Sequence, residues 1–334
     1  MSGSSTLSFD ALNSALKAAG EETRLRVLVL LAEAELTVSD LTDILRQSQP
    51  RISRHLKLLA EAGLVERFRE GTWAFFRLAE HGSGADVARA LIERLNPGDQ
   101  TITRDRARLA SVRQARAAAA QAYFRAHAAE WDRIRKLHVT DDAVEEAIRA
   151  ALADKPFRSL LDLGTGTGRM LELFGPEIER GLGLDFSLDM LLLARDRLER
   201  AGLKNCSVRQ GDIYDLPLAD DSFDVVILHQ VLHFLDDGSR AIHEAARVLR
   251  PGGRLLVVDF APHEQEFLRE QYAHRRLGFA SETVTQWMTA SDLEPVLHKS
   301  LAPEPGPEGK IAVSLWLARD TRALMAAPHR REVA

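Results

Sequence analysis

The sequence predicts two domains of different fold class, a small helical domain that ends in a two-stranded hairpin and a larger α/β domain with a mostly parallel sheet. The first prediction rests on a series of helical patterns followed by two short strand patterns before residue 80. The second rests on strand and helix patterns that alternate from residue 156 onward, as in a parallel sheet covered on both faces. A length of 334 residues, 45% of them apolar, also favours two domains.

Three helices are predicted before residue 46. Apolar residues fall at helical spacing from Phe9 to Leu31, and a break at Ala19-Gly20 divides this stretch into two helices. Thr37 and Asp40 have the spacing of a capping box ahead of an apolar run, so a third helix begins there.

A fourth helix is predicted from about Gln49 to Ala62, followed by two strands. Pro50 suits its first turn and Gly63 its C-terminal cap. The stretches Leu64 to Arg69 and Thr72 to Leu78 then have strand patterns. Four helices followed by a hairpin indicate a winged helix-turn-helix domain.

This region is basic although the chain carries a net charge of −5. Between Arg46 and Arg77 there are seven Lys or Arg residues and three acidic residues. A local positive patch can attract nucleic acid even in an acidic protein.

Residues 10 to 95 resemble the ArsR family of bacterial winged-helix repressors. The resemblance rests on a recognition helix, its cap and a wing in the family's order, namely Ser48-Gln49-Pro50-Arg51-Ile52-Ser53-Arg54-His55-Leu56-Lys57-Leu58-Leu59, Ala62-Gly63-Leu64-Val65, Arg69-Glu70-Gly71-Thr72-Trp73 and Phe76-Arg77-Leu78. It implies a homodimer that binds palindromic double-stranded operator DNA, with the fourth helix in the major groove. The residues that it implies at the DNA are Gln49, Arg51, Ser53, Arg54, Lys57 and Arg69.

The metal sites of that family are not expected. Where many members carry Cys-Val-Cys in the third helix, this chain has Thr37-Val38-Ser39, and hydroxyls do not replace thiolates as soft ligands. In the fifth helix Asp86 and Glu93 occur without a histidine. We therefore expect an inducer other than a metal ion.

Four segments are expected along the chain: the DNA-binding domain over 8–96, a helical linker and lid region over 97–155, the α/β domain over 156–318 and a disordered tail over 319–334. The linker is an Ala- and Arg-rich helical stretch, Arg104 to Arg135, followed by an amphipathic helix from Asp141 to Leu152. Its aromatic residues either pack as anchors or cover a ligand cleft; they are Tyr123, Phe124 and Trp131.

The α/β domain opens with a glycine-rich loop. A short apolar strand ends at Asp162, and Gly164, Gly166 and Gly168 precede a helix start, where backbone N–H groups can face a ligand. A nicotinamide fingerprint fits poorly because its third glycine would be residue 169, an Arg. A second strand ends on Asp185, which suits two ribose hydroxyls, so a ribose-bearing ligand is expected, with a tight turn that binds nothing as the alternative.

The remaining strands are expected near Ser207–Gly211, Phe223–His229 and Arg254–Phe260, with a closing antiparallel hairpin of Val296–Leu301 and Ile311–Leu317. The single cysteine, Cys206, excludes an intrachain disulfide and is expected to open a buried strand. No stretch has the pattern of a signal peptide or of an apolar span, so a cytoplasmic location is expected.

Residues 120 to 318 resemble the class I S-adenosylmethionine-dependent methyltransferases, in the branch of the ubiquinone/menaquinone C-methyltransferases. The resemblance rests on five motifs in order, Asp162-x-Gly-x-Gly-x-Gly168, Gly183-Leu-Asp-Phe-Ser-x-x-Met190, Gly211-Asp-x-x-x-Leu-Pro217, Phe223-Asp-Val-Val226 and Arg247-Val-Leu-Arg-Pro-Gly-Gly253. It implies S-adenosylmethionine as the cofactor and S-adenosylhomocysteine as its product. The implied cofactor-binding residues are Asp162, Gly164, Gly166, Gly168, Asp185, Phe186, Ser187, Met190, Asp212, Ile213 and His229.

Catalysis needs a base only if the methyl acceptor must lose a proton. His229 and His233 follow the fourth strand at the carboxyl edge of the sheet and are the candidate catalytic residues, although either could be structural. Asp259 and Tyr123 are weaker candidates.

A small molecule is the expected acceptor. The residues after the fourth strand, Leu228-His229-Gln230-Val231, lack the motif of amino-methylating DNA enzymes, and one cysteine suits neither cytosine-C5 nor arsenite methylation. The leading hypothesis is a DNA-binding regulator fused to an active methyltransferase. The alternative is a regulator whose second domain senses S-adenosylmethionine or S-adenosylhomocysteine without catalysis.

Overall fold

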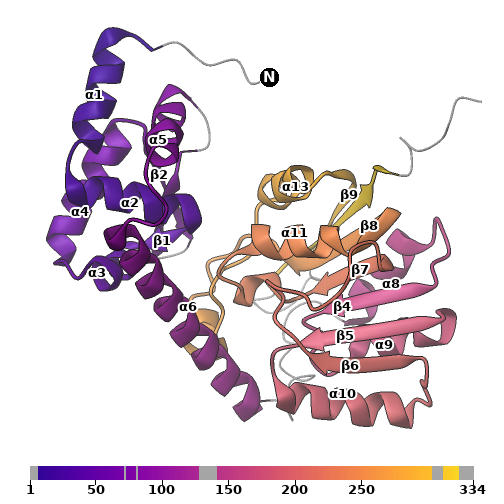
Figure 1. Cartoon of the computed structure of the whole chain (residues 1–334). Helices are drawn as coiled ribbons and strands as arrows, with labels where there is room; N and C mark the ends of the chain where they lie inside the picture. Colours follow the sequence, from indigo (N-terminus) through magenta and orange to yellow (C-terminus); the bar gives the residue numbers. More distant parts are fainter. Residues whose placement is uncertain (1–6, 71–72, 80–81, 128–140, 303–310, 323–334) are drawn as a thin grey trace, which may run out of the picture. The chain divides into compact units, whose positions relative to one another are not determined.

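The computed structural model of this protein describes residues 7–70, 73–79, 82–127, 141–302 and 311–322. The chain divides into two compact units between Ala118 and Ala119, inside the long helix α6 (Gln100–His127; Figure 1). Each unit has its own apolar core. Among the described residues, no helix combines the length and the apolar character that crossing a membrane requires.

The first unit is a winged helix-turn-helix domain, as the sequence predicts. The helices are α1 (Phe9–Ala19), α2 (Glu22–Glu33), α3 (Val38–Leu45), α4 (Gln49–Glu61) and α5 (Ser83–Glu93), and the strands are β1 (Leu36–Thr37), β2 (Val65–Glu70) and β3 (Trp73–Leu78). The strands form an antiparallel sheet with the order β1-β3-β2, in which β1 comes from between α2 and α3 and the hairpin of β2 and β3 follows α4.

Local chemistry sets the ends of the two helices of the helix-turn-helix. Thr37 and Asp40 form the capping box of α3: the N–H of Thr37 donates to Asp40 Oδ2 at 2.8 Å, and the N–H of Asp40 donates to Thr37 Oγ1 at 3.2 Å. Helix α4 begins with Pro50 in its first turn, and Gly63 follows it with φ +67°, a conformation that glycine adopts without strain.

The second unit is a seven-stranded sheet with the order β6-β5-β4-β7-β8-β10-β9. The first five strands in this order are parallel, whereas β10 is antiparallel to both β8 and β9. The strands are β4 (Ser159–Leu163), β5 (Arg180–Asp185), β6 (Cys206–Gln210), β7 (Phe223–His229), β8 (Leu249–Phe260), β9 (Leu293–Leu301) and β10 (Val313–Asp320). The predicted closing hairpin is therefore confirmed.

Helices cover both faces of this sheet (Figure 1). One face packs against α8 (Asp141–Leu152), α9 (Arg169–Phe174) and α10 (Leu188–Arg200), and the other against α11 (Gly238–Arg247) and α13 (Ser281–Ala290). Residues of one strand alternate between the two cores: Leu160 lies in the first and Leu161 in the second. The short helix α12 (Phe267–Tyr272) lies in the segment after β8.

Some local expectations differ from the structure. Cys206 opens β6, but β6 is an edge strand in which only Val208 is buried. Strand β8 begins at Leu249, because Leu249 pairs with Phe223 before the register shifts and Arg254 pairs with Val225. Strand β10 continues to Asp320, past the predicted start of the tail. Trp131 lies outside the described residues.

Candidate functional site

The glycine loop connects β4 to α9 at the carboxyl edge of the parallel sheet. Asp162 is buried and accepts a 2.6 Å hydrogen bond from the hydroxyl of Thr165, and the N–H of Gly164 donates to the carbonyl of Leu184 at 2.8 Å. Gly164 has φ +69°, and a Cβ there would lie 2.3 Å from Cγ2 of Val231. Both the backbone conformation and the close approach of Val231 therefore require glycine at this position.

Asp185 ends the neighbouring strand β5 and holds the glycine loop. Its Oδ2 accepts a hydrogen bond of 2.8 Å from the N–H of Gly166, and its Oδ1 accepts one of 2.8 Å from the N–H of Ser187. Burial raises the pKa of this carboxyl above that of an ordinary aspartate, while these backbone hydrogen bonds oppose the shift. The carboxylate that was predicted to meet ribose hydroxyls thus lies directly beside the loop.

The other residues expected at a cofactor gather at the same edge. Ser187 and Met190 are buried, and the Ser187 side chain caps α10, whereas Phe186 is half exposed. Asp212 is exposed and accepts from the N–H of Tyr214 at 2.9 Å. Gly211, just before it, donates its N–H to the carbonyl of Asp185 at 3.1 Å. Ile213 packs against the core on the α11 face, and Gly168, with φ +83°, caps α9.

The two candidate catalytic histidines have different surroundings. His229 ends β7 and is partly buried, whereas His233 lies in the short 3₁₀ turn Leu232–Phe234 and is only 2% exposed. Nδ1 of His233 lies 2.8 Å from Oδ1 of Asp259, which is fully buried near the end of β8. Sequence reasoning ranked Asp259 below the histidines, because Asp259 and His233 are 26 positions apart and their contact cannot be read from the sequence.

Arg169 occupies the position where the nicotinamide fingerprint would have its third glycine. It begins α9 and links this helix to α8. Its Nε and Nη2 donate to the two carboxylate oxygens of Glu145, each at 2.7 Å, and its Nη1 donates to Glu172 at 2.6 Å. The hydrogen bond to Glu145 raises the pKa of Arg169, so the guanidinium stays charged. No sequence pattern pointed to this contact.

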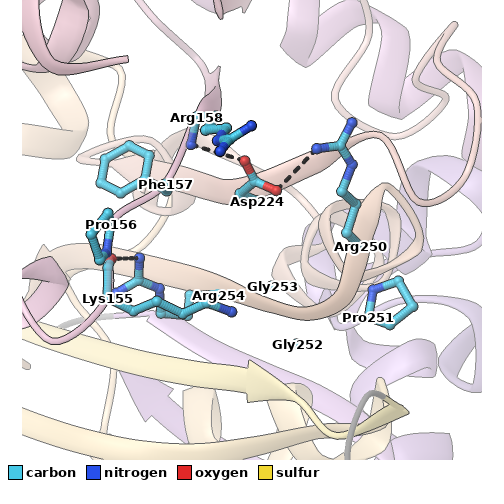
Figure 2. Close-up of a pocket in the computed structure, with 10 residues that line it drawn as sticks. All are labelled: Lys155, Pro156, Phe157, Arg158, Asp224, Arg250, Pro251, Gly252, Gly253 and Arg254. Carbon is cyan, nitrogen blue, oxygen red and sulfur yellow. Dashed lines mark hydrogen bonds and ion pairs between the residues drawn. The ribbon is translucent and has the colours of Figure 1, made fainter. Parts of the chain in front are cut away.

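A cavity of about 160 Å³ lies at the opposite, amino edge of the sheet (Figure 2). Asp224 accepts hydrogen bonds of 2.9 Å from the N–H of Arg158 and 3.0 Å from Arg250, and Arg254 donates to the carbonyl of Lys155 at 2.6 Å. These charged groups hold the starts of β4, β7 and β8 together, far from the glycine loop. We assign this cavity a structural role.

In the first unit, α4 buries one face and exposes another. Ile52, His55, Leu56 and Leu59 are buried. The residues expected at DNA on this helix are all exposed, and so is Arg69 on β2; the helix residues are Gln49, Arg51, Ser53, Arg54 and Lys57. This basic face of the helix is therefore exposed rather than packed in the core of the unit.

The parallel sheet, the glycine loop and the acidic residue that ends β5 define a methyltransferase-type Rossmann fold, joined here to a winged helix-turn-helix domain. The model of the methyltransferase domain family matches residues 161–257, and that of the arsR family of bacterial regulatory proteins matches residues 21–67.

Relatives of known sequence and structure agree with this assignment. Demethylmenaquinone methyltransferase of Thermobifida fusca is 33% identical over 165 residues, which cover 47% of this chain and 68% of that protein. The methyltransferase YcgJ of Bacillus subtilis is 34% identical over 115 residues, 34% of this chain and 46% of that protein, so the chain spans about half of that relative's length. The chain belongs to the class I methyltransferases, with an N-terminal DNA-binding domain of the ArsR family.

A solved structure shows the same fold. A chain of the complex between the Haloferax volcanii Trm112 methyltransferase activator and its methyltransferase superimposes with a TM-score of 0.50 and 22% identity. The superposition covers 59% of this chain and 97% of the other.

Proposed function

We propose that this protein is a DNA-binding regulator whose second domain binds S-adenosylmethionine and transfers its methyl group to a small molecule. The observation that carries the proposal is the Asp185 carboxylate, which holds the glycine loop through Gly166 and stands where ribose hydroxyls would meet it. Each carboxylate oxygen accepts one backbone hydrogen bond and keeps further acceptor capacity for a hydroxyl.

The residues at this edge suit the cofactor chemically. The glycine loop would approach its methionine end, Asp185 its ribose and Asp212 its adenine amino group, with Ser187 and Met190 beside the ribose and adenine. When bound, S-adenosylmethionine supplies an electrophilic methyl group. The chain's own contribution is to hold the acceptor close and aligned, which can supply up to about 7 to 11 kcal/mol.

The acceptor would enter at the carboxyl edge near His229 and His233. A relative from Thermobifida fusca is named for demethylmenaquinone, so an acceptor of that class is one candidate for this site.

The first unit would read operator DNA as a homodimer in the cytoplasm. The exposed polar residues of α4 would face the major groove, and Arg69 the flanking backbone. Helix α1 exposes Phe9, Leu12 and Leu16, which are spaced for one helical face. A second copy of the chain would cover these apolar side chains.

Helix α6 is the proposed route of coupling. Within the first unit it contacts the helix-turn-helix at both ends of α3: Arg116 pairs with Asp40 in the capping box, and Arg108 donates to the carbonyl of Ile44 at 3.1 Å. Arg113 donates to the carbonyl of Glu33 at the end of α2, at 2.8 Å. Helix α6 continues past Ala118. A movement of its far end would therefore be transmitted to α3, the first helix of the helix-turn-helix.

A second candidate function is sensing without catalysis. The observation that favours it is the fusion itself, because a winged helix-turn-helix domain joined to a methyltransferase domain favours a regulatory purpose. In this case S-adenosylmethionine or its product would act only as an effector.

Titration calorimetry tests the proposal. Wild type is expected to bind S-adenosylmethionine, and Asp185→Ala is expected to abolish detectable binding. Asp196→Ala removes an exposed carboxylate of α10 and serves as the control, because its partner Arg200 is also exposed. Near-wild-type affinity in Asp185→Ala would count against the proposed site. Transfer of a labelled methyl group to a cell extract then separates the enzyme from the sensor.

A further inference from the structure

A buried histidine and a buried aspartate form a pair at the carboxyl edge of the sheet. Oδ1 of Asp259 lies 2.8 Å from Nδ1 of His233 and also accepts a 2.8 Å hydrogen bond from the N–H of Phe260. Oδ2 of Asp259 accepts from the N–H of His233 at 3.4 Å. The aspartate therefore fixes both the backbone and the ring of His233.

This contact selects the tautomer of the ring. An ionised carboxylate only accepts hydrogen bonds, so Nδ1 of His233 carries the hydrogen and Nε2 keeps its lone pair. Nε2 of His233 is thus a basic nitrogen whose orientation is fixed by the hydrogen bond between Nδ1 and Asp259, as in the catalytic triads of hydrolases.

The surroundings of the ring are aromatic. The rings of Phe234, Phe260 and His274 have their centroids 4.0, 4.8 and 4.2 Å from that of His233. The ionisable groups that face it are Asp259 from β8 and His274 from the segment after α12; Arg275 is engaged with Asp236. An imidazolium formed here would be stabilised mainly by the Asp259 carboxylate.

We propose that His233 is the base that removes a proton from a weakly acidic hydroxyl of the methyl acceptor, and that Asp259 is its positioning residue. This inference rests on the proposed methyl transfer and adds the acceptor's chemical class. Acceptors that are already ionised or carry a free lone pair, such as thiolates and tertiary amines, need no such base.

The proposed step is balanced. The hydroxyl proton passes to Nε2 of His233, and the electron pair left on the acceptor oxygen, or on a carbon conjugated with it, forms the bond to the methyl carbon. The carbon–sulfur bond breaks and its electron pair stays on sulfur, which becomes a neutral thioether. The imidazolium then releases its proton to water.

The first test needs no acceptor. In full-length protein with ¹⁵N-labelled histidine, NMR is expected to show His233, assigned by its loss in His233→Asn, as the Nδ1–H tautomer. Asp259→Asn is expected to change the tautomer, because an amide can donate to Nδ1 as well as accept from it. A wild-type ring in the Nε2–H form, with the protein folded, would overturn the inference.

The second test follows transfer of a labelled methyl group from S-adenosylmethionine to an extract of the source cells. His233→Asn is expected to lower the rate by about 10²- to 10⁴-fold near neutral pH, with recovery at alkaline pH where the hydroxyl ionises by itself. Asp259→Asn is expected to move the pH profile, whereas His243→Asn, on an exposed part of α11, is expected to leave it unchanged.

Calorimetry with S-adenosylmethionine checks that each variant keeps its fold and cofactor site. If the rate falls equally at every pH while cofactor affinity is retained, the pair of His233 and Asp259 is structural. This result would overturn the inference but not the proposed methyl transfer. No transfer by wild type would overturn the proposed enzymatic function, and with it this assignment.

Discussion

Arg26 on α2 and Asp105 on α6 form a two-point ion pair: Nε of Arg26 donates to Oδ2 at 2.6 Å and Nη2 donates to Oδ1 at 2.8 Å. Both side chains are largely buried, and the hydrogen bonds to Asp105 raise the pKa of Arg26. The pair attaches the start of α6 to α2 of the winged helix-turn-helix domain.

Removing one partner of this pair is expected to destabilise the first unit. Asp105→Ala leaves the Arg26 guanidinium buried without its carboxylate, at a cost of about 3 kcal/mol. Scanning calorimetry of the full chain measures the change in the melting of this unit. Asp86→Ala removes an exposed partner of Arg89 and is expected to have little effect; equal losses in the two variants would contradict this account.

Arg54→Ala is expected to weaken binding to the DNA upstream of the protein's own gene. Arg54 is exposed on α4, and an arginine that contacts a guanine edge contributes about 1 to 3 kcal/mol of discrimination. Titrations at fixed salt against this DNA and against random DNA measure the difference. Equal losses on both would identify a phosphate contact instead. Arg200→Ala, on α10, serves as the control for the loss of one exposed cation.

His55 is expected to make the first unit less stable in acid. Burial lowers its pKa below the usual 6.5, Arg24, Arg51 and Arg54 act in the same direction, and Glu21, 3.6 Å from Nδ1, opposes them. The unfolded chain then takes up the proton more readily than the folded one. Stability is complete above pH 6.5 and is lost as the pH falls from there toward the lowered pKa.

Melting temperatures of the first unit between pH 5 and 8 measure this effect. His55→Leu is expected to flatten the pH dependence, because it removes the titrating group from a site where neither ring nitrogen has a hydrogen-bond partner among the described residues. His243→Leu, on an exposed part of α11, is expected to leave the wild-type slope. An unchanged slope in His55→Leu would rule out His55 as its source.

Arg169→Ala is expected to destabilise the second unit and to loosen the helix after the glycine loop. Loss of the charged hydrogen bonds to Glu145 and Glu172 costs about 2 kcal/mol. Calorimetric melting measures the loss, and Arg200→Ala, whose pair with Asp196 is exposed, is the matched control. A smaller change in Arg169→Ala than in the control would contradict a stabilising role.

Much of the fold follows from local patterns. The capping box at Thr37, the glycine at residue 63 and the acidic end of β5 at Asp185 each depend on neighbours in the sequence, and the structure has them as predicted. The burial of His55 could also have been predicted from spacing, because residues 52, 55, 56 and 59 share one helical face.

The contacts that join distant segments could not be predicted in this way. Arg26 and Asp105 are 79 positions apart, Arg169 and Glu145 are 24 apart, and His233 meets Asp259 only because β7 and β8 lie side by side. A single sequence does not indicate which distant residues will be in contact. The chemistry of the side chains identified the candidate residues, but only the packing of the fold determines which of them meet.

We propose that the cofactor site and the DNA-binding domain share one conformational equilibrium. The most direct measurement is the affinity for the DNA upstream of the protein's own gene, at fixed salt, alone and with saturating S-adenosylmethionine or S-adenosylhomocysteine. We expect one of the two ligands to change this affinity about tenfold, which corresponds to about 1.4 kcal/mol of coupling. Binding curves that superimpose under all three conditions would contradict the claim and leave two domains that are only tethered.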